Sequence, residues 1–459
     1  MYPLIKEWVE RLTVINLDRA NENYVKAYDS FANGDFDGIS RYLPDEWLEQ
    51  RTKHAERQKE EGKQQLELLQ ALTEVAKQNV KIADAELADI AMSYMLKAKA
   101  MALENKYEQA ISYYEKAINI DPSNADNIWE FAYYLHAIRE YSKAEIYYKK
   151  CLEIYRKLAD ENPKAYLPDV ATTLNNLGVL HSDLNEYSKA LKEYEETLEI
   201  RSKLADENPK AYLPDVAMTL NNLANLHSDL NEYPKALKEY EEALEIRRKL
   251  ADENSKAYLP YVAGTLNNLG ILHSDIHEYS KALKEYEESL EIYRKLADEN
   301  PKAYLPNVAD TLNNLANLHS DLNEYSKALK ECEEALEIHR KFADENPKVY
   351  VKNVAETLGN LSGYYLFTKE YLKSEQSARK ALELDGASFA KTNLAHALLF
   401  QNHFSEAEKI YKELSQTVYR NNETYTQILL DDFDALEKAG VIPESRKADV
   451  EKIRKILKQ

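Results

Sequence analysis

Four histidines recur at a spacing of 46 residues, at positions His181, His227, His273 and His319. Imidazole is a common zinc ligand, so an evenly spaced set of histidines is a candidate metal site. Equivalent helices of stacked repeats lie about 8–10 Å apart, however, whereas zinc needs its nitrogen ligands at about 2 Å. One ion therefore cannot be shared along the row. We expect the histidines to fill space between helices, and we predict no metal site and no cofactor.

The sequence contains none of the short motifs that mark catalytic or nucleotide-binding loops. Glycine-rich phosphate-binding loops, the Gly-x-Ser-x-Gly turn and the His-Glu-x-x-His motif do not occur, and the ten glycines are scattered. Cys151 and Cys332 are the only cysteines and lie far apart, which excludes a disulfide framework. Residues 1–90 show no nucleophile–base set. We predict no catalytic residue and a protein that is not an enzyme.

Asparagines form a second row with the same spacing, and they are candidate binding residues. Asparagine is unfavourable inside helices, so its repetition at a fixed helical phase needs a reason. Its amide both donates and accepts hydrogen bonds, which matches a peptide backbone of any sequence. The candidate peptide-binding residues are Asn175, Asn176, Asn221, Asn222, Asn225, Asn267, Asn268, Asn313, Asn314, Asn317 and Asn360. The alternative is a structural ladder in which these amides bond across adjacent repeats and fix their register.

Both rows belong to a long internal repeat. The segment that begins at Leu158 returns almost unchanged from Leu204, Leu250 and Leu296, and more loosely from Phe342. Within each unit, apolar residues three to four positions apart predict two amphipathic helices. The elements that position the histidines and asparagines are therefore paired helices, repeated along the chain.

The prolines and asparagines between the apolar segments predict where these helices begin and end. In one unit we expect the first helix to begin at Pro168 and the Asn185–Glu186 pair to form the turn into the second. Asn162 precedes Pro163, and a residue before proline disfavours the helical conformation. The Pro-Lys-Ala-Tyr-Leu-Pro segment is therefore expected to form an elbow between units.

The unit resembles the tetratricopeptide repeat, in which small and aromatic residues alternate at fixed places. The matching residues are Leu177, Gly178, His181, Ala190, Tyr194 and Thr197. The small residue at the position of Ala190 marks eight units, at Ala110, Ala144, Ala190, Ala236, Ala282, Ala328, Ser374 and Ala407. The Thr-Leu-Asn-Asn-Leu-Ala motif is similar to the kinesin-light-chain-like repeats of bacterial proteins. The resemblance implies an all-α, right-handed α-solenoid of helix hairpins, with first helices lining a concave groove into which the asparagines point.

The repeat boundaries divide the chain into three expected regions. Residues 1–90 form an N-terminal helical region with a charged connector, residues 91–420 form the eight-unit solenoid, and residues 421–459 form capping helices. Caps are expected because the end units of a stack need a polar outer face.

The charge balance restricts the partners. Sixty Lys and Arg residues stand against 80 Asp and Glu residues, which gives a net charge of −20. Such a surface repels nucleic acid and anionic membranes. No apolar run reaches the roughly 18 residues of a membrane span. Residues 1–12 lack the apolar core of a signal peptide, so we expect a cytoplasmic location.

The groove positions favour a particular kind of partner. Asn, Ser and Asp occupy them, with Lys99 as the main basic exception, and Trp129 and Tyr133 are expected to add an aromatic surface near one end. We therefore predict a scaffold that binds a protein or peptide segment, neutral or basic rather than acidic, in its groove. The alternative is a structural spacer or self-assembly module that regulates or positions a separate effector domain.

Overall fold

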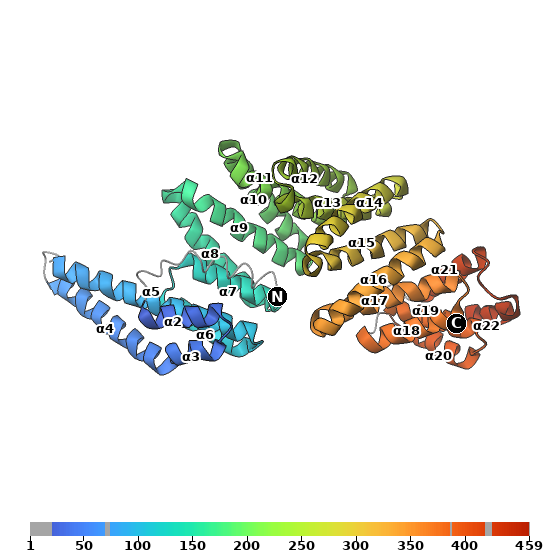
Figure 1. Ribbon diagram of the computed structural model, residues 1–459, viewed down its shortest axis with the longest axis horizontal. Helices are drawn as coiled ribbons and strands as arrows, with labels where there is room; N and C mark the ends of the chain where they lie inside the picture. The colour runs from blue at the N-terminus through green and yellow to red at the C-terminus, as the bar shows by residue number, and fades with distance from the viewer. Residues whose placement is uncertain (1–20, 69–73, 386–387, 418–424, 459) are drawn as a thin grey trace. The chain divides into compact units, whose positions relative to one another are not determined.

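The computed structural model describes residues 21–68, 74–385, 388–417 and 425–458, and within these ranges the chain forms helices and no strand (Figure 1). The segment that bears on a signal peptide, residues 1–12, lies outside the described residues. The all-α fold and its consecutive helix hairpins are as predicted. The chain divides into two compact units, residues 1–212 and 213–459, which are described separately below.

In the first unit, each helix packs mainly against its neighbours in the sequence. Its helices are α2 (Glu22–Ala32), α3 (Phe36–Tyr42), α4 (Asp45–Leu68), α5 (Glu74–Leu103), α6 (Tyr107–Ile120), α7 (Ala125–Ala137), α8 (Tyr141–Glu161), α9 (Pro163–Asp183) and α10 (Tyr187–Glu207).

The charged connector expected near the N-terminus is part of α4, which packs along α5. Arg51 Nε lies 3.0 Å from the Glu86 carboxylate, and Lys59 Nζ lies 2.5 Å from that of Asp84. The boundary expected at residue 90 falls inside α5, which continues to Leu103 and pairs with α6. The helix that carries the charged sequence is therefore joined to the first hairpin rather than separated from it.

The second unit continues the same pattern of consecutive hairpins. Its helices are α11 (Pro209–Asp229, mostly in this unit), α12 (Tyr233–Glu253), α13 (Ser255–Asp275), α14 (Tyr279–Glu299), α15 (Pro301–Asp321), α16 (Tyr325–Glu345), α17 (Pro347–Phe367), α18 (Tyr371–Asp385), α19 (Ser388–Phe400), α20 (Phe404–Ser415), α21 (Tyr425–Lys438), the short η3 (Glu444–Arg446) and α22 (Lys447–Leu457). Both α21 and α22 pack against α20, with Phe433 and Ile453 fully buried. These two helices cover the apolar side of the last hairpin.

The turn inside each long hairpin is a helix C-cap with one left-handed residue. Asn185 has φ = 58°, and the Glu186 amide donates to the His181 carbonyl at 2.7 Å. The same bond recurs after His227, His273 and His319. Asparagine tolerates positive φ, and this pattern satisfies carbonyls that the helix end leaves open. The prediction of a turn at Asn185–Glu186 is confirmed.

The elbow predicted before Pro168 is wrong. The first helix begins five residues earlier, at Pro163, and Pro168 lies inside it. Proline suits the first position of a helix, because its φ is already helical and the amide it lacks would have no partner there. Asn162 is therefore the only residue between α8 and α9. Pro168 costs the helix one backbone hydrogen bond, and burial of Val170 and Leu174 in the following turns holds the helix continuous.

The small residues of the repeat allow the two helices of a hairpin to approach closely. Ala190 is fully buried where α9 and α10 meet. A Cβ atom on Gly178 would lie 2.6 Å from the Tyr194 ring, and one on Gly270 would lie 2.7 Å from the Tyr286 ring. The absence of a Cβ atom at the glycine thus allows the tyrosine ring to pack directly against the opposite helix.

Candidate functional site

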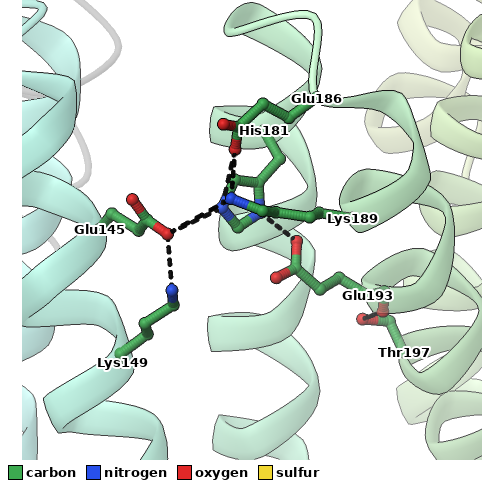
Figure 2. Close-up of polar contacts among 7 residues, drawn as sticks. All are labelled: Glu145, Lys149, His181, Glu186, Lys189, Glu193 and Thr197. Carbon is green, nitrogen blue, oxygen red and sulfur yellow. Dashed lines mark hydrogen bonds and ion pairs between the residues drawn. The ribbon is translucent and has the colours of Figure 1, made fainter.

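The histidine row forms charged clusters that link the two helices of each hairpin. Figure 2 shows the cluster at His181, which is buried between α8, α9 and α10. Its Nδ1 lies 2.6 Å from the Glu193 carboxylate, and its Nε2 lies 3.2 Å from that of Glu145 on the preceding hairpin. At the edge of the cluster, Lys149 forms an ion pair with Glu145, and Lys189 forms one with Glu186. Burial raises the pKa of Glu193, and the hydrogen bond from His181 opposes part of that rise.

The same pairing recurs along the second unit, at 2.7 Å in each of His227–Glu239, His273–Glu285 and His319–Glu331. In the last long unit Tyr365 replaces the histidine and Ser377 replaces the glutamate. The two positions change together, as expected of a pair that stabilises the hairpin. The histidines therefore pack between helices, as predicted, and the described residues contain no group of three His, Cys, Asp or Glu side chains arranged to hold a metal ion.

The asparagine row lies on the first helices, and several of its members bond to one another across repeats. Asn268 Nδ2 donates to Asn225 Oδ1 at 3.3 Å, and Asn314 Nδ2 donates to Asn267 Oδ1 at 3.1 Å. Asn313 Nδ2 donates to Thr357 Oγ1 at 2.9 Å. These are the contacts expected if the amides fix the register between repeats.

The other candidate asparagines differ in exposure and partners. Asn175 in the first unit is buried, whereas Asn176 in the same unit and Asn222 and Asn360 in the second are half-buried. Asn317 is exposed and accepts a hydrogen bond from the Tyr364 hydroxyl. The row is therefore not uniform in exposure or in hydrogen-bond partners.

Three of the asparagines do converge on one cavity in the second unit. Its volume is about 330 Å³, and α11, α12, α13, α14 and α15 all contribute to its walls. The residues that define it include Asn221, Asn267, Asn268, Arg247, Tyr261 and Tyr293. Asn221 accepts a hydrogen bond from Arg247 Nη1 at 3.1 Å. The cavity is thus open to a ligand and lined by amides, two phenol rings and one cation.

Arg247 is the functional candidate that the sequence analysis missed. It lies on the second helix α12 beside the exposed Arg248 and Lys249, yet it is only 7 % exposed. Burial lowers its pKa to about 10, so the guanidinium is charged at neutral pH. One signal was present: the equivalent residues of the following repeats are Tyr293 and His339, although the surrounding sequence hardly changes.

Two other expected surface residues are internal. Lys99 is buried, with its Nζ 2.8 Å from the Glu130 carboxylate, so its charge is balanced inside the first unit. Trp129 is also buried, stacked on Tyr133 with ring centroids 5.3 Å apart. The prediction that Trp129 contributes an aromatic surface is therefore wrong. The ring lies in the hydrophobic core between α7 and its neighbours.

Comparison with known families identifies the hairpins. Models described as tetratricopeptide repeat match residues 91–124, 125–203, 215–295 and 261–341, which together cover more than half of the chain. The chain belongs to the tetratricopeptide repeat family. No curated protein matches it. No helix among the described residues of this tetratricopeptide array is both long and apolar enough to cross a membrane.

Solved structures with similar folds are other helical repeat proteins of low identity. BtubC (BKLC) from P. vanneervenii is 24% identical, with a TM-score of 0.43, over 52% of this chain and 89% of that one. The apo form of RapI is 19% identical, with a TM-score of 0.47, over 64% of this chain and 97% of that one. A chain of the APC/C hetero-tetramer Cut9-Hcn1 is 17% identical, with a TM-score of 0.45, over 77% of this chain and 59% of that one.

Proposed function

We propose that this tetratricopeptide array binds a protein segment along the face formed by its first helices in the second unit. The observation that carries the proposal is the cavity at which Asn221, Asn267 and Asn268 meet. Amide groups beside an open cavity offer donors and acceptors to a peptide backbone. The family supports the general role, because tetratricopeptide arrays are protein-interaction scaffolds.

The charge of the same unit favours a segment that is neutral or basic overall. Asp229, Asp275 and Asp321 end the helices α11, α13 and α15, where the helix dipole disfavours negative charge. Burial raises the pKa of all three carboxyl groups. His277 opposes part of the rise in pKa at Asp275 and Asp321, and the charge of Asp275 adds to the rise at Asp321. A basic segment would relieve this unfavourable charge.

We infer a binding role without catalysis and a cytoplasmic location. Cys151 and Cys332 are buried, and burial raises the pKa of the Cys151 thiol to about 12, which leaves it protonated and unreactive. Two separate buried thiols suit a reducing compartment. The tetratricopeptide family is typically non-catalytic, which supports the same inference.

The second candidate is a spacer or self-assembly module. The bonds from Asn268 to Asn225 and from Asn314 to Asn267 favour it, because they use the amides within the array. Light scattering distinguishes the two functions. A defined oligomer that captures no other protein would support the spacer, and a monomer that captures a partner would support the scaffold.

The test of the scaffold replaces four amides together, as Asn221→Ala, Asn222→Ala, Asn267→Ala and Asn268→Ala. The full chain is used to capture proteins from lysate of the native host, and mass spectrometry compares the captured sets. We expect the variant to fold, by circular dichroism, and to lose the partner of the wild type. The control is Glu245→Ala with Lys249→Ala, an exposed ion pair on α12. A folded amide variant that captures the same partners equally well would exclude groove binding.

A further inference from the structure

The repeats of this chain differ from one another in a pattern that points to the cavity. Residues 163–346 contain four copies that agree at most positions. At the position of Tyr261 the neighbouring copies carry Asp215 and Asn307, and at the position of Gly264 they carry Met218 and Asp310. Tyr261, Gly264, Asn307 and Asp310 all line the cavity. The copies therefore keep a common frame and vary in chemical type where the cavity forms.

Arg247 occupies another of these variable positions, and packing does not require it there. The following copies place Tyr293 and His339 at the same point of the second helix, and both of these are buried too. The hairpin accommodates an uncharged phenol at this place, as Tyr293 shows. The preceding copy carries Arg201 at this position, also buried, so two of the four copies hold an arginine here and the other two hold an aromatic ring.

The charge of Arg247 is not balanced within the described part of the chain, where no carboxylate lies within ion-pair distance of it. Its Nη1 donates to Asn221 Oδ1 at 3.1 Å, to the Tyr261 carbonyl at 3.3 Å and to the Thr265 hydroxyl, all of which are neutral. The guanidinium also lies 5.7 Å from the centroid of the Tyr261 ring. None of these hydrogen bonds uses Nε or Nη2, so donors remain for a ligand.

We propose that the cavity at Arg247 is a pocket for one acidic side chain, Asp or Glu, of the bound segment, and this rests on the proposed function. A buried cation without an anion is unfavourable, and the planar guanidinium matches a carboxylate with two parallel hydrogen bonds. Gly264 contributes no side chain where other copies have Thr172, Met218 or Asp310. A volume of about 330 Å³ is large enough to admit one Asp or Glu side chain.

The pocket also explains how an acidic residue fits a segment that is basic overall. Asp310 lines the same cavity, but its carboxylate lies 3.3 Å from His339 Nε2 on the other side. The negative charge of Asp310 repels a doubly charged phosphate beside Arg247 more strongly than it repels a singly charged carboxylate. Asp275 and Asp321, at the ends of α13 and α15, favour basic residues elsewhere in the segment. The expected ligand therefore combines basic residues with one carboxylate at a fixed position.

The test uses a random peptide library displayed on phage and the immobilised full-length chain, so that no natural partner needs to be known. Wild type is expected to select peptides that share one Asp or Glu at a fixed position. In synthetic copies, the change to Asn or Gln at that position should weaken binding about 30-fold or more. Arg247→Tyr should weaken the original peptide equally, and the amide peptide should then bind no worse than the acidic one.

Two controls keep the result specific. Arg247→Tyr copies the residue of the next repeat, and an unchanged melting temperature shows that it folds. Arg248→Tyr alters the neighbouring exposed arginine, which pairs with both oxygens of Glu288, and should bind like wild type. Selected peptides without a shared acidic residue, or equal binding by the Arg247 variant, would overturn the pocket and leave the scaffold standing. No selected peptide at all would overturn the scaffold itself.

Discussion

The histidine clusters and the Arg247 pocket are both buried ionisable sites in the same repeats. They differ in whether a group of opposite charge lies beside them. Each histidine has a glutamate of its own hairpin within 2.7 Å, and the four copies are alike. Arg247 has only neutral partners, and the equivalent residues of the following copies are Tyr293 and His339. A buried charge that is paired in all four copies maintains the hairpin, whereas a buried cation without an anion is available to a ligand.

The largest effect expected from this contrast is on the stability of a hairpin. His227→Ala should lower the free energy of unfolding by about 3 kcal/mol or more, because it leaves the Glu239 carboxylate buried without its partner and opens a cavity. Urea unfolding followed by circular dichroism measures the change. The matched control, His227→Tyr with Glu239→Ser, copies Tyr365 and Ser377 and should lose much less. Equal losses in the two variants would show that the pair is not a unit.

A smaller effect should appear in the pH dependence of stability. The folded pKa values of Asp275 and Asp321 are raised, so their contribution is full below the unfolded pKa and is lost as pH rises through the folded values. Asp275→Asn with Asp321→Asn should therefore stabilise the chain at pH 7, by about 0.5 kcal/mol after allowance for exposure, and have no effect near pH 3.

The control for that experiment is Asp183→Asn in the first unit. Asp183 occupies the same place in its repeat but lies 3.0 Å from His136 Nε2. Its loss should not stabilise the chain at neutral pH. Chemical unfolding at several pH values distinguishes the two variants. A double variant that is stabilised equally at every pH would contradict the assignment to carboxyl titration.

The smallest expected effect on stability is that of Arg247→Tyr, which contrasts with the large effect of His227→Ala. Arg247→Tyr should change the free energy of unfolding by less than about 1 kcal/mol, although it replaces a buried charged residue, because the same hairpin geometry already holds Tyr293. Thermal and urea unfolding measure it. A loss as large as that of His227→Ala would mean that Arg247 is part of the hairpin's own structure.

The sequence predicted the features that each repeat supplies for itself. Helix pairing, the turn at Asn185–Glu186 and the small residue at Ala190 follow from spacing, left-handed tolerance and steric fit within one unit. The start of the first helix was missed at Pro163, because the restraint on the residue before proline does not prevent a helix from beginning at that proline itself.

The candidate site was harder to predict because it depends on several units at once. The asparagines were found from their repetition, but their bonds across repeats depend on the distance between α11, α13 and α15. Arg247 was missed because its position on the second helix alternates with exposed charges such as Arg248 and Lys249. The contacts of α12 with α11 and α13 bury Arg247, and these depend on the folded array.

The link between consecutive hairpins has a consequence for how such a chain can grow. Asn254, Asn300 and Asn346 are each the single residue between two helices, with φ near −140° and ψ near 80°. Since each helical residue turns the chain by about 100°, one inserted residue would rotate every later hairpin relative to those before it. Growth that preserves the alignment of the asparagines must therefore proceed by whole 46-residue repeats. The distance between equivalent asparagines along the array can then change only by whole repeats.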